Sequence, residues 1–113
     1  MKTRAFLLLL TLCITFEASA YQQIHRKVRA RFEDEVKVMD HHMNLSKQQE
    51  AIIMQLKIDL LLRNNEARNK HGAGSKTFKA AKDVNMKTFQ RGLKENVTAG
   101  QLQAYRDYLA NKR

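Results

Sequence analysis

The side chains best suited to binding a metal form one short run, Met39-Asp40-His41-His42-Met43. On a helix, Met39, His42 and Met43 stand at i, i+3 and i+4 and share a face, while His41 points about 100° away from His42. Two thioethers and an imidazole form a soft ligand set that suits Cu(I), and the carboxylate of Asp40 suits a harder ion less specifically. Because Met39 and Met43 also belong to an apolar stripe, we favour amphipathic packing over a metal site.

Residues that could support catalysis are scarce. The acidic run Glu33-Asp34-Glu35 is flanked by Arg29, Arg31 and Lys37, a pattern typical of ion pairs along a helix rather than of paired catalytic carboxylates. No glycine-rich phosphate loop and no nucleophile beside a base is apparent in the sequence. We therefore expect neither an enzyme nor a bound cofactor.

A repeated motif is the most informative feature of the chain. The runs Asn44–Gln49 and Asn96–Gln101 both read Asn-apolar-Ser/Thr-x-x-Gln. Each run predicts a capping box, in which the hydroxyl of Ser46 or Thr98 accepts from the N3 backbone N–H and the glutamine side chain reaches back to the N-cap N–H. Two such motifs, at matched places, indicate a duplicated helical design.

Apolar spacing predicts four helices and no strand, since no useful length of sequence alternates with period two. The first long helix carries the stripe Ile24, Val28, Phe32, Val36, Met39 and Met43. The second begins after Leu45 and carries Ile52, Ile53, Leu56, Leu60 and Ala67. The third runs from about Lys76 to Glu95, with Phe78, Ala81, Phe89 and Leu93 inward and Gly92 weakening its end. The fourth is short and carries Leu102, Tyr105 and Leu109.

The N-terminus predicts export. Lys2 and Arg4 precede an apolar run from Phe6 to Phe16, and Ala18-Ser19-Ala20 supplies a small-x-small cleavage site. We expect a signal peptide over residues 1–20, cleaved after Ala20, and a single helical domain over residues 21–113. The apolar run is too short for a permanent membrane span. The single cysteine, Cys13, leaves with the signal, so the mature chain has no disulfide.

Removing the signal leaves 19 basic and 10 acidic residues, a net charge of +9. Such a charge accelerates encounter with acidic partners, and salt weakens this electrostatic attraction. Export disfavours nucleic acid as the partner. An anionic membrane surface remains an alternative for the first helix, although its acidic run opposes that contact. Methionines add adaptable apolar surface. The candidate client-binding cations are Arg26, Arg29, Lys57, Arg63, Lys79 and Lys82.

The paired motifs resemble the LTxxQ signature of the Spy/CpxP-like periplasmic proteins of Gram-negative bacteria. Leu45-Ser46-Lys47-Gln48-Gln49 matches with Ser in place of Thr, and Val97-Thr98-Ala99-Gly100-Gln101 matches with Val in place of Leu. The likeness covers roughly residues 24 to 110. Departures are the short segment Gly72–Ser75 and Gly100 inside the second motif.

The resemblance implies a curved, elongated protomer of four helices in two helical hairpins, which pairs as a homodimeric cradle. It implies a periplasmic location and ATP-independent binding of unfolded or damaged envelope proteins, or a role as an envelope-stress adaptor. The alternative is a metal-binding protein for copper or zinc resistance. The resemblance also implies that the motif residues are structural and position helices rather than contact clients: Leu45, Ser46, Gln49, Val97, Thr98 and Gln101. A chain this short would also gain stability from dimerisation.

Overall fold

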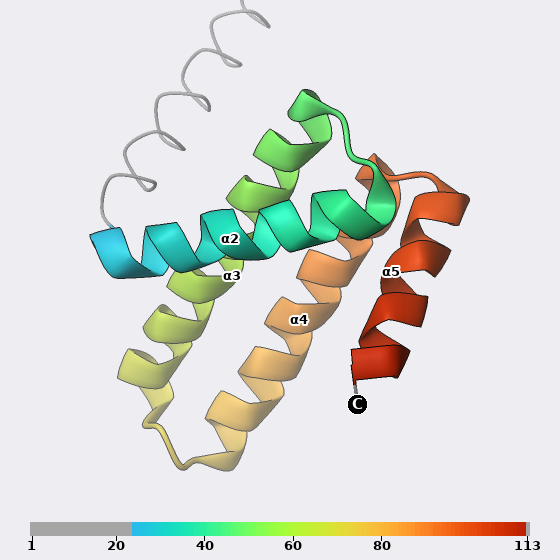
Figure 1. Ribbon diagram of the computed structural model, residues 1–113. Helices are drawn as coiled ribbons and strands as arrows, with labels where there is room; N and C mark the ends of the chain where they lie inside the picture. Colours follow the sequence, from blue (N-terminus) through green and yellow to red (C-terminus); the bar gives the residue numbers. More distant parts are fainter. Residues whose placement is uncertain (1–23, 113) are drawn as a thin grey trace, which may run out of the picture.

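The computed structural model describes residues 24–112, and within them every regular element is an α-helix. The helices are α2 (Arg26–Met43), α3 (Lys47–His71), α4 (Lys76–Asn96) and α5 (Ala99–Lys112) (Figure 1). The predicted all-α class with four helices is confirmed over this range. The predicted signal segment, with Cys13 and the cleavage site after Ala20, lies outside the described residues.

Local capping chemistry sets the helix boundaries. Helix α2 ends at Met43, and its C-cap Asn44 adopts the left-handed conformation with φ 55° and donates its backbone N–H to the carbonyl of Asp40. Helix α3 ends at His71, and the φ of 89° at its C-cap Gly72 suits a residue without a Cβ. The hydroxyl of Ser75 then accepts from the backbone N–H of Phe78 at 3.1 Å and starts α4. The turn predicted at residues 71–75 is confirmed over residues 72–75, and His71 is the last residue of α3.

The helices form a thin, open arrangement. Helices α3 and α4 run antiparallel and pack along each other, while α2 lies across them and also contacts α5 (Figure 1). The principal extents are 52 × 38 × 26 Å. The smallest extent accommodates about two helix diameters of roughly 10–12 Å each. The expected pairing into two separate hairpins is not confirmed, because α5 packs mainly on α2 rather than on α4.

A small core lies where the N-termini of α3 and α5 meet the C-terminal halves of α2 and α4. The buried side chains are Val36, Met39, Met43, Leu45, Ile53 and Leu93, and half-buried Met54, Phe89, Val97, Leu102 and Tyr105 pack against them. The predicted stripe on the first helix is confirmed from Phe32 to Met43. Helix α5 buries no side chain fully, so it depends on partial contacts with its neighbours.

Gly92 lies where two helices approach each other closely. The third predicted helix, expected from about Lys76 to Glu95, is confirmed as α4 and ends at Asn96. A methyl group at Gly92 would lie 2.6 Å from Cδ2 of Leu56 on α3. The missing side chain therefore permits the close approach of α3 to α4.

No helix within residues 24–112 is long and apolar enough to cross a membrane.

Candidate functional site

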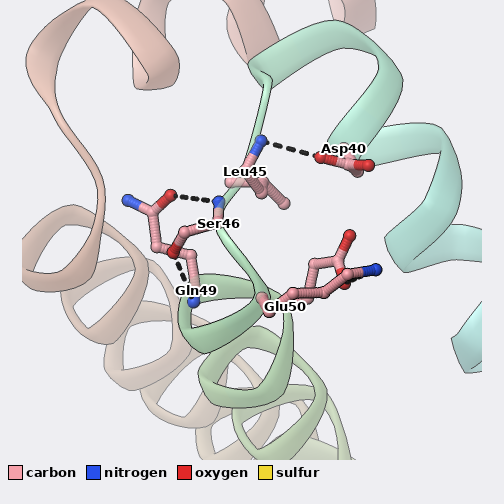
Figure 2. Close-up of polar contacts among 6 residues, drawn as sticks. Asp40, Leu45, Ser46, Gln49 and Glu50 are labelled. Carbon is pink, nitrogen blue, oxygen red and sulfur yellow. Dashed lines mark hydrogen bonds and ion pairs between the residues drawn. The ribbon is translucent and has the colours of Figure 1, made fainter.

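The first capping box forms as predicted at the start of α3. The hydroxyl of Ser46 accepts from the backbone N–H of Gln49 at 3.0 Å, and Oε1 of Gln49 accepts from the N–H of Ser46 at 2.9 Å (Figure 2). Asp40 extends the same network, since its Oδ1 accepts from the N–H of Leu45 at 2.8 Å. Asp40 thus fixes the turn between α2 and α3 through its hydrogen bond to the backbone.

The second capping box repeats the first at the start of α5. The hydroxyl of Thr98 accepts from the N–H of Gln101 at 3.1 Å, and Oε1 of Gln101 accepts from the N–H of Thr98 at 2.9 Å. Val97 is half-buried against the core in the place that Leu45 takes in the first motif. Both predicted boxes are therefore confirmed.

The two boxes also bind each other. Nε2 of Gln49 donates to Oε1 of Gln101 at 2.9 Å, and Nε2 of Gln101 donates to Oε1 of Gln49 at 3.0 Å. Each side-chain amide also donates to a backbone carbonyl at the end of another helix. Nε2 of Gln49 donates to the carbonyl of Asn96 at the end of α4, at 3.1 Å, and Nε2 of Gln101 donates to the carbonyl of Asn44 at the end of α2, at 3.2 Å. The result is a reciprocal glutamine clamp, formed by Gln49 and Gln101, that joins residues 52 apart in sequence.

The hydrogen bonds of the clamp have an approximate two-fold relation. It exchanges the α2–α3 junction, with Asn44 and Gln49, and the α4–α5 junction, with Asn96 and Gln101. No buried side-chain nitrogen or oxygen within residues 24–112 lacks a hydrogen-bond partner. The side-chain amides of Gln49 and Gln101 thus form their hydrogen bonds within the protein. The clamp therefore positions helices rather than offering hydrogen-bonding groups to a ligand.

The candidate metal ligands occupy two different environments. Met39 and Met43 are each 3% exposed and belong to the core. His42 is exposed, and its ring stacks on Tyr108 of α5 with centroids 4.0 Å apart. His41 lies edge-on to His42 at 5.1 Å. Both thioethers are therefore committed to packing, and within residues 24–112 no group of three or more His, Cys, Asp and Glu side chains is arranged to hold a metal.

Three of the six candidate client-binding cations are engaged in ion pairs. Nζ of Lys57 lies 2.7 Å from a carboxylate oxygen of Glu35, and only 15% of the Lys57 side chain is exposed. Arg63 pairs with Asp59 at 2.8 Å, and Arg29 lies 4.0 Å from Glu33. These side chains tie helices together or brace one helix, which leaves them less suited to bind a client.

The other three candidates are exposed, one on α2 and two on α4. Arg26 begins α2, and Lys79 lies on α4. Nζ of Lys82 lies 4.7 Å from the ring centroid of Phe78 and covers that apolar side chain. The six candidates are therefore distributed in twos over α2, α3 and α4.

Tyr105 links α5 to the core and is electrostatically perturbed. Burial raises the pKa of its hydroxyl above the ordinary value of 10.0, and the negative charge of Glu35 and the neighbouring Tyr108 raise it further. The neutral phenol is thus favoured in the folded chain.

Two grooves flank the clamp, one between each corresponding pair of helices. The groove between α4 and α5, here the α4–α5 groove, has a volume of about 440 Å³, and that between α2 and α3, the α2–α3 groove, about 470 Å³. Cations line the α4–α5 groove without any acid: Arg91, Lys94 and Arg106. Acids predominate in the α2–α3 groove, which is lined by Glu33, Asp40 and Glu50 against Lys37 and Lys47.

The six candidate client-binding cations do not include the cations of the α4–α5 groove. Arg91 and Lys94 flank the buried Leu93 on α4, and Arg106 follows Tyr105 on α5. The sequence feature that could have indicated them is the position of basic residues directly beside apolar stripe residues, near the junction of α4 and α5. Only the tertiary structure brings these residues of the two helices together in one groove.

Comparisons with known proteins add no assignment: no family model, no curated protein and no solved structure matches this chain.

Proposed function

We propose that this chain is an exported, ATP-independent chaperone or envelope-stress adaptor that binds unfolded or damaged proteins through a basic and apolar surface. The observation that carries the proposal is a large excess of unpaired positive charge on a thin helical scaffold. Between residues 24 and 112 there are 18 lysines and arginines. Five of them form ion pairs with carboxylates in that range: Arg29, Arg31, Lys47, Lys57 and Arg63.

Exposed apolar side chains accompany that charge. Val84 is 62% exposed, and Val38, Met86 and Leu109 are also well exposed. Long basic side chains lay apolar stems along such surface while the charged ends attract acidic groups. This combination supports loose binding of varied unfolded chains better than it supports one small ligand.

The likeness of the two motifs to the LTxxQ signature supports the same proposal. Both motifs form capping boxes, and the clamp explains why a glutamine is needed at each sixth position of the two runs. We extend the proposal to a periplasmic location, a curved homodimeric cradle and the absence of enzyme activity. The metal-resistance alternative finds less support, because binding through Met39 and Met43 would withdraw both from the core.

The experiment is an aggregation assay with the protein purified after export. An unfolded client is diluted into buffer without ATP, with and without the protein, at low and high salt. We expect stoichiometric suppression of light scattering that weakens as salt rises, because the attraction is between exposed charges. No suppression at a stoichiometric excess over several acidic clients would refute the proposed function.

Size-exclusion chromatography with light scattering tests the dimer in the same samples. A mass of one chain at micromolar concentration would refute the homodimeric cradle without affecting client binding.

A further inference from the structure

The α4–α5 groove differs from the rest of the basic surface because it combines an apolar floor with cations on both walls. The floor consists of Leu93, Leu102, Tyr105 and Leu109. Leu93 is 3% exposed and Leu109 is 39% exposed, so the floor runs from the core to solvent.

The cations of this groove are free to take an external partner. Arg91 and Lys94 stand on α4 and Arg106 stands on α5. None of the three forms an ion pair with a carboxylate of residues 24–112. The nearest acid in sequence on α5, Asp107, accepts instead from Nε2 of Gln103. Unpaired cations beside apolar surface favour a carboxylate-bearing partner.

The α2–α3 groove shows that this charge arrangement is not simply the average of the chain. The α2–α3 groove is of similar size but carries three acids and two lysines. Glu50 of that groove corresponds by the repeat to Leu102, and Met54 corresponds to Arg106. The two grooves therefore differ in charge, although both lie next to the clamp.

Part of the floor of the α4–α5 groove lies on a helix that is only partly packed. Helix α5 rests mainly on α2 and buries no side chain fully. On α5 the floor residues Leu102, Tyr105 and Leu109 span seven positions, or about 10 Å of helix. That length suits about two turns of an amphipathic helix laid into a groove.

We infer that the α4–α5 groove binds acidic amphipathic segments of client polypeptides, with the apolar face of the segment on the leucine floor and its carboxylates against Arg91, Lys94 and Arg106. The inference rests on the proposed function and names its client class. Cations on both walls suit several carboxylates spread along a peptide. A single-chain amphiphile, in contrast, carries its charge at one end only.

The test uses a fluorescently labelled helical peptide with leucines at i, i+3 and i+7 flanked by glutamates. Binding is followed by anisotropy with the protein purified after export. The groove variant combines Arg91→Gln, Lys94→Gln and Arg106→Gln. The control variant combines Lys70→Gln, Lys76→Gln and Lys87→Gln, which removes the same charge from exposed positions outside the groove.

We expect the groove variant to lose about tenfold or more in affinity and the control variant less than about threefold, because only the former removes direct charge pairs. A peptide with glutamine in place of every glutamate should bind the unaltered protein about tenfold more weakly. Equal losses in both variants, or equal binding of the two peptides, would overturn the inference. The peptide comparison decides the question even if the groove variant fails to fold.

Two further readouts separate this inference from the proposed function. If the unaltered protein suppresses aggregation and the groove variant does so equally well, the groove inference fails and the proposed function stands. If the peptide binds through the groove but no client is protected, the inference stands and the proposed function fails. Dodecanoate binding that is lost in the groove variant, without any loss of peptide binding, would assign the groove to an amphiphile and overturn the inference.

Discussion

Replacing Gln101 by alanine tests whether the two capping boxes act as one unit. The substitution removes the acceptor for the N–H of Thr98, the donor to the carbonyl of Asn44 and both hydrogen bonds to Gln49. The bonds to Gln49 are partly buried, and each such bond contributes about 0.5–1.5 kcal/mol net. The capping contribution adds about 0.5–1 kcal/mol. We expect a loss of about 2–3 kcal/mol in the free energy of unfolding.

The partner substitution Gln49→Ala should cost a similar amount, because Gln49 makes the matching set of bonds. The double variant should lose less than the sum of the two single losses. Both singles remove the same two amide–amide bonds, so the coupling free energy should be about 1–2 kcal/mol. For a domain of this size, each kcal/mol lowers Tm by about 4–8 °C.

The assay is urea unfolding followed by circular dichroism at 222 nm for the unaltered protein, both single variants and the double variant. Gln48→Ala is the matched control, since Gln48 neighbours Gln49 on α3 but is exposed. Strict additivity of the two losses would refute the clamp. Single losses no larger than that of the control would refute the capping account of the repeat as well.

Three further predictions concern the core and α5. Ile53→Ala should cost about 2–5 kcal/mol in urea unfolding because Ile53 is fully buried, whereas Val84→Ala, at a 62% exposed position, should change stability by less than about 0.5 kcal/mol. Tyr108→Ala removes the 4.0 Å stack on His42 and should accelerate amide hydrogen exchange in α5 before the other helices; uniform acceleration would contradict this. The raised pKa of Tyr105 contributes stability that is present below its ordinary value of 10.0 and lost as pH rises through the raised value. Tyr105→Phe should therefore reduce the fall in Tm above pH 10, and an unchanged alkaline slope would count against the burial of that hydroxyl.

The sequence by itself determined the helices and their ends. Capping boxes act between residues three apart, so Ser46 with Gln49 and Thr98 with Gln101 could be read from spacing alone. The apolar stripe on the first helix likewise predicted the buried side chains from Phe32 to Met43. These features are local, and the fold left them as the sequence predicted.

Tertiary structure decided which side chains are available for function. Spacing placed Met39, His42 and Met43 on one face, but the packing of α3, α4 and α5 buried both thioethers and turned the imidazole to Tyr108. The sequence predicted that Lys57 is an exposed cation, but the packing of α2 on α3 places a carboxylate oxygen of Glu35 2.7 Å from its Nζ.

The clamp and the α4–α5 groove also depend on tertiary structure. Gln49 and Gln101 meet only because the fold brings the N-termini of α3 and α5 together, and Arg106 faces Arg91 and Lys94 across a groove only because α5 rests on α2. Contacts between residues far apart in sequence depend on how amphipathic helices share a core. The hydrophobic effect that drives this sharing is non-directional, so periodicity along one helix does not specify its neighbour.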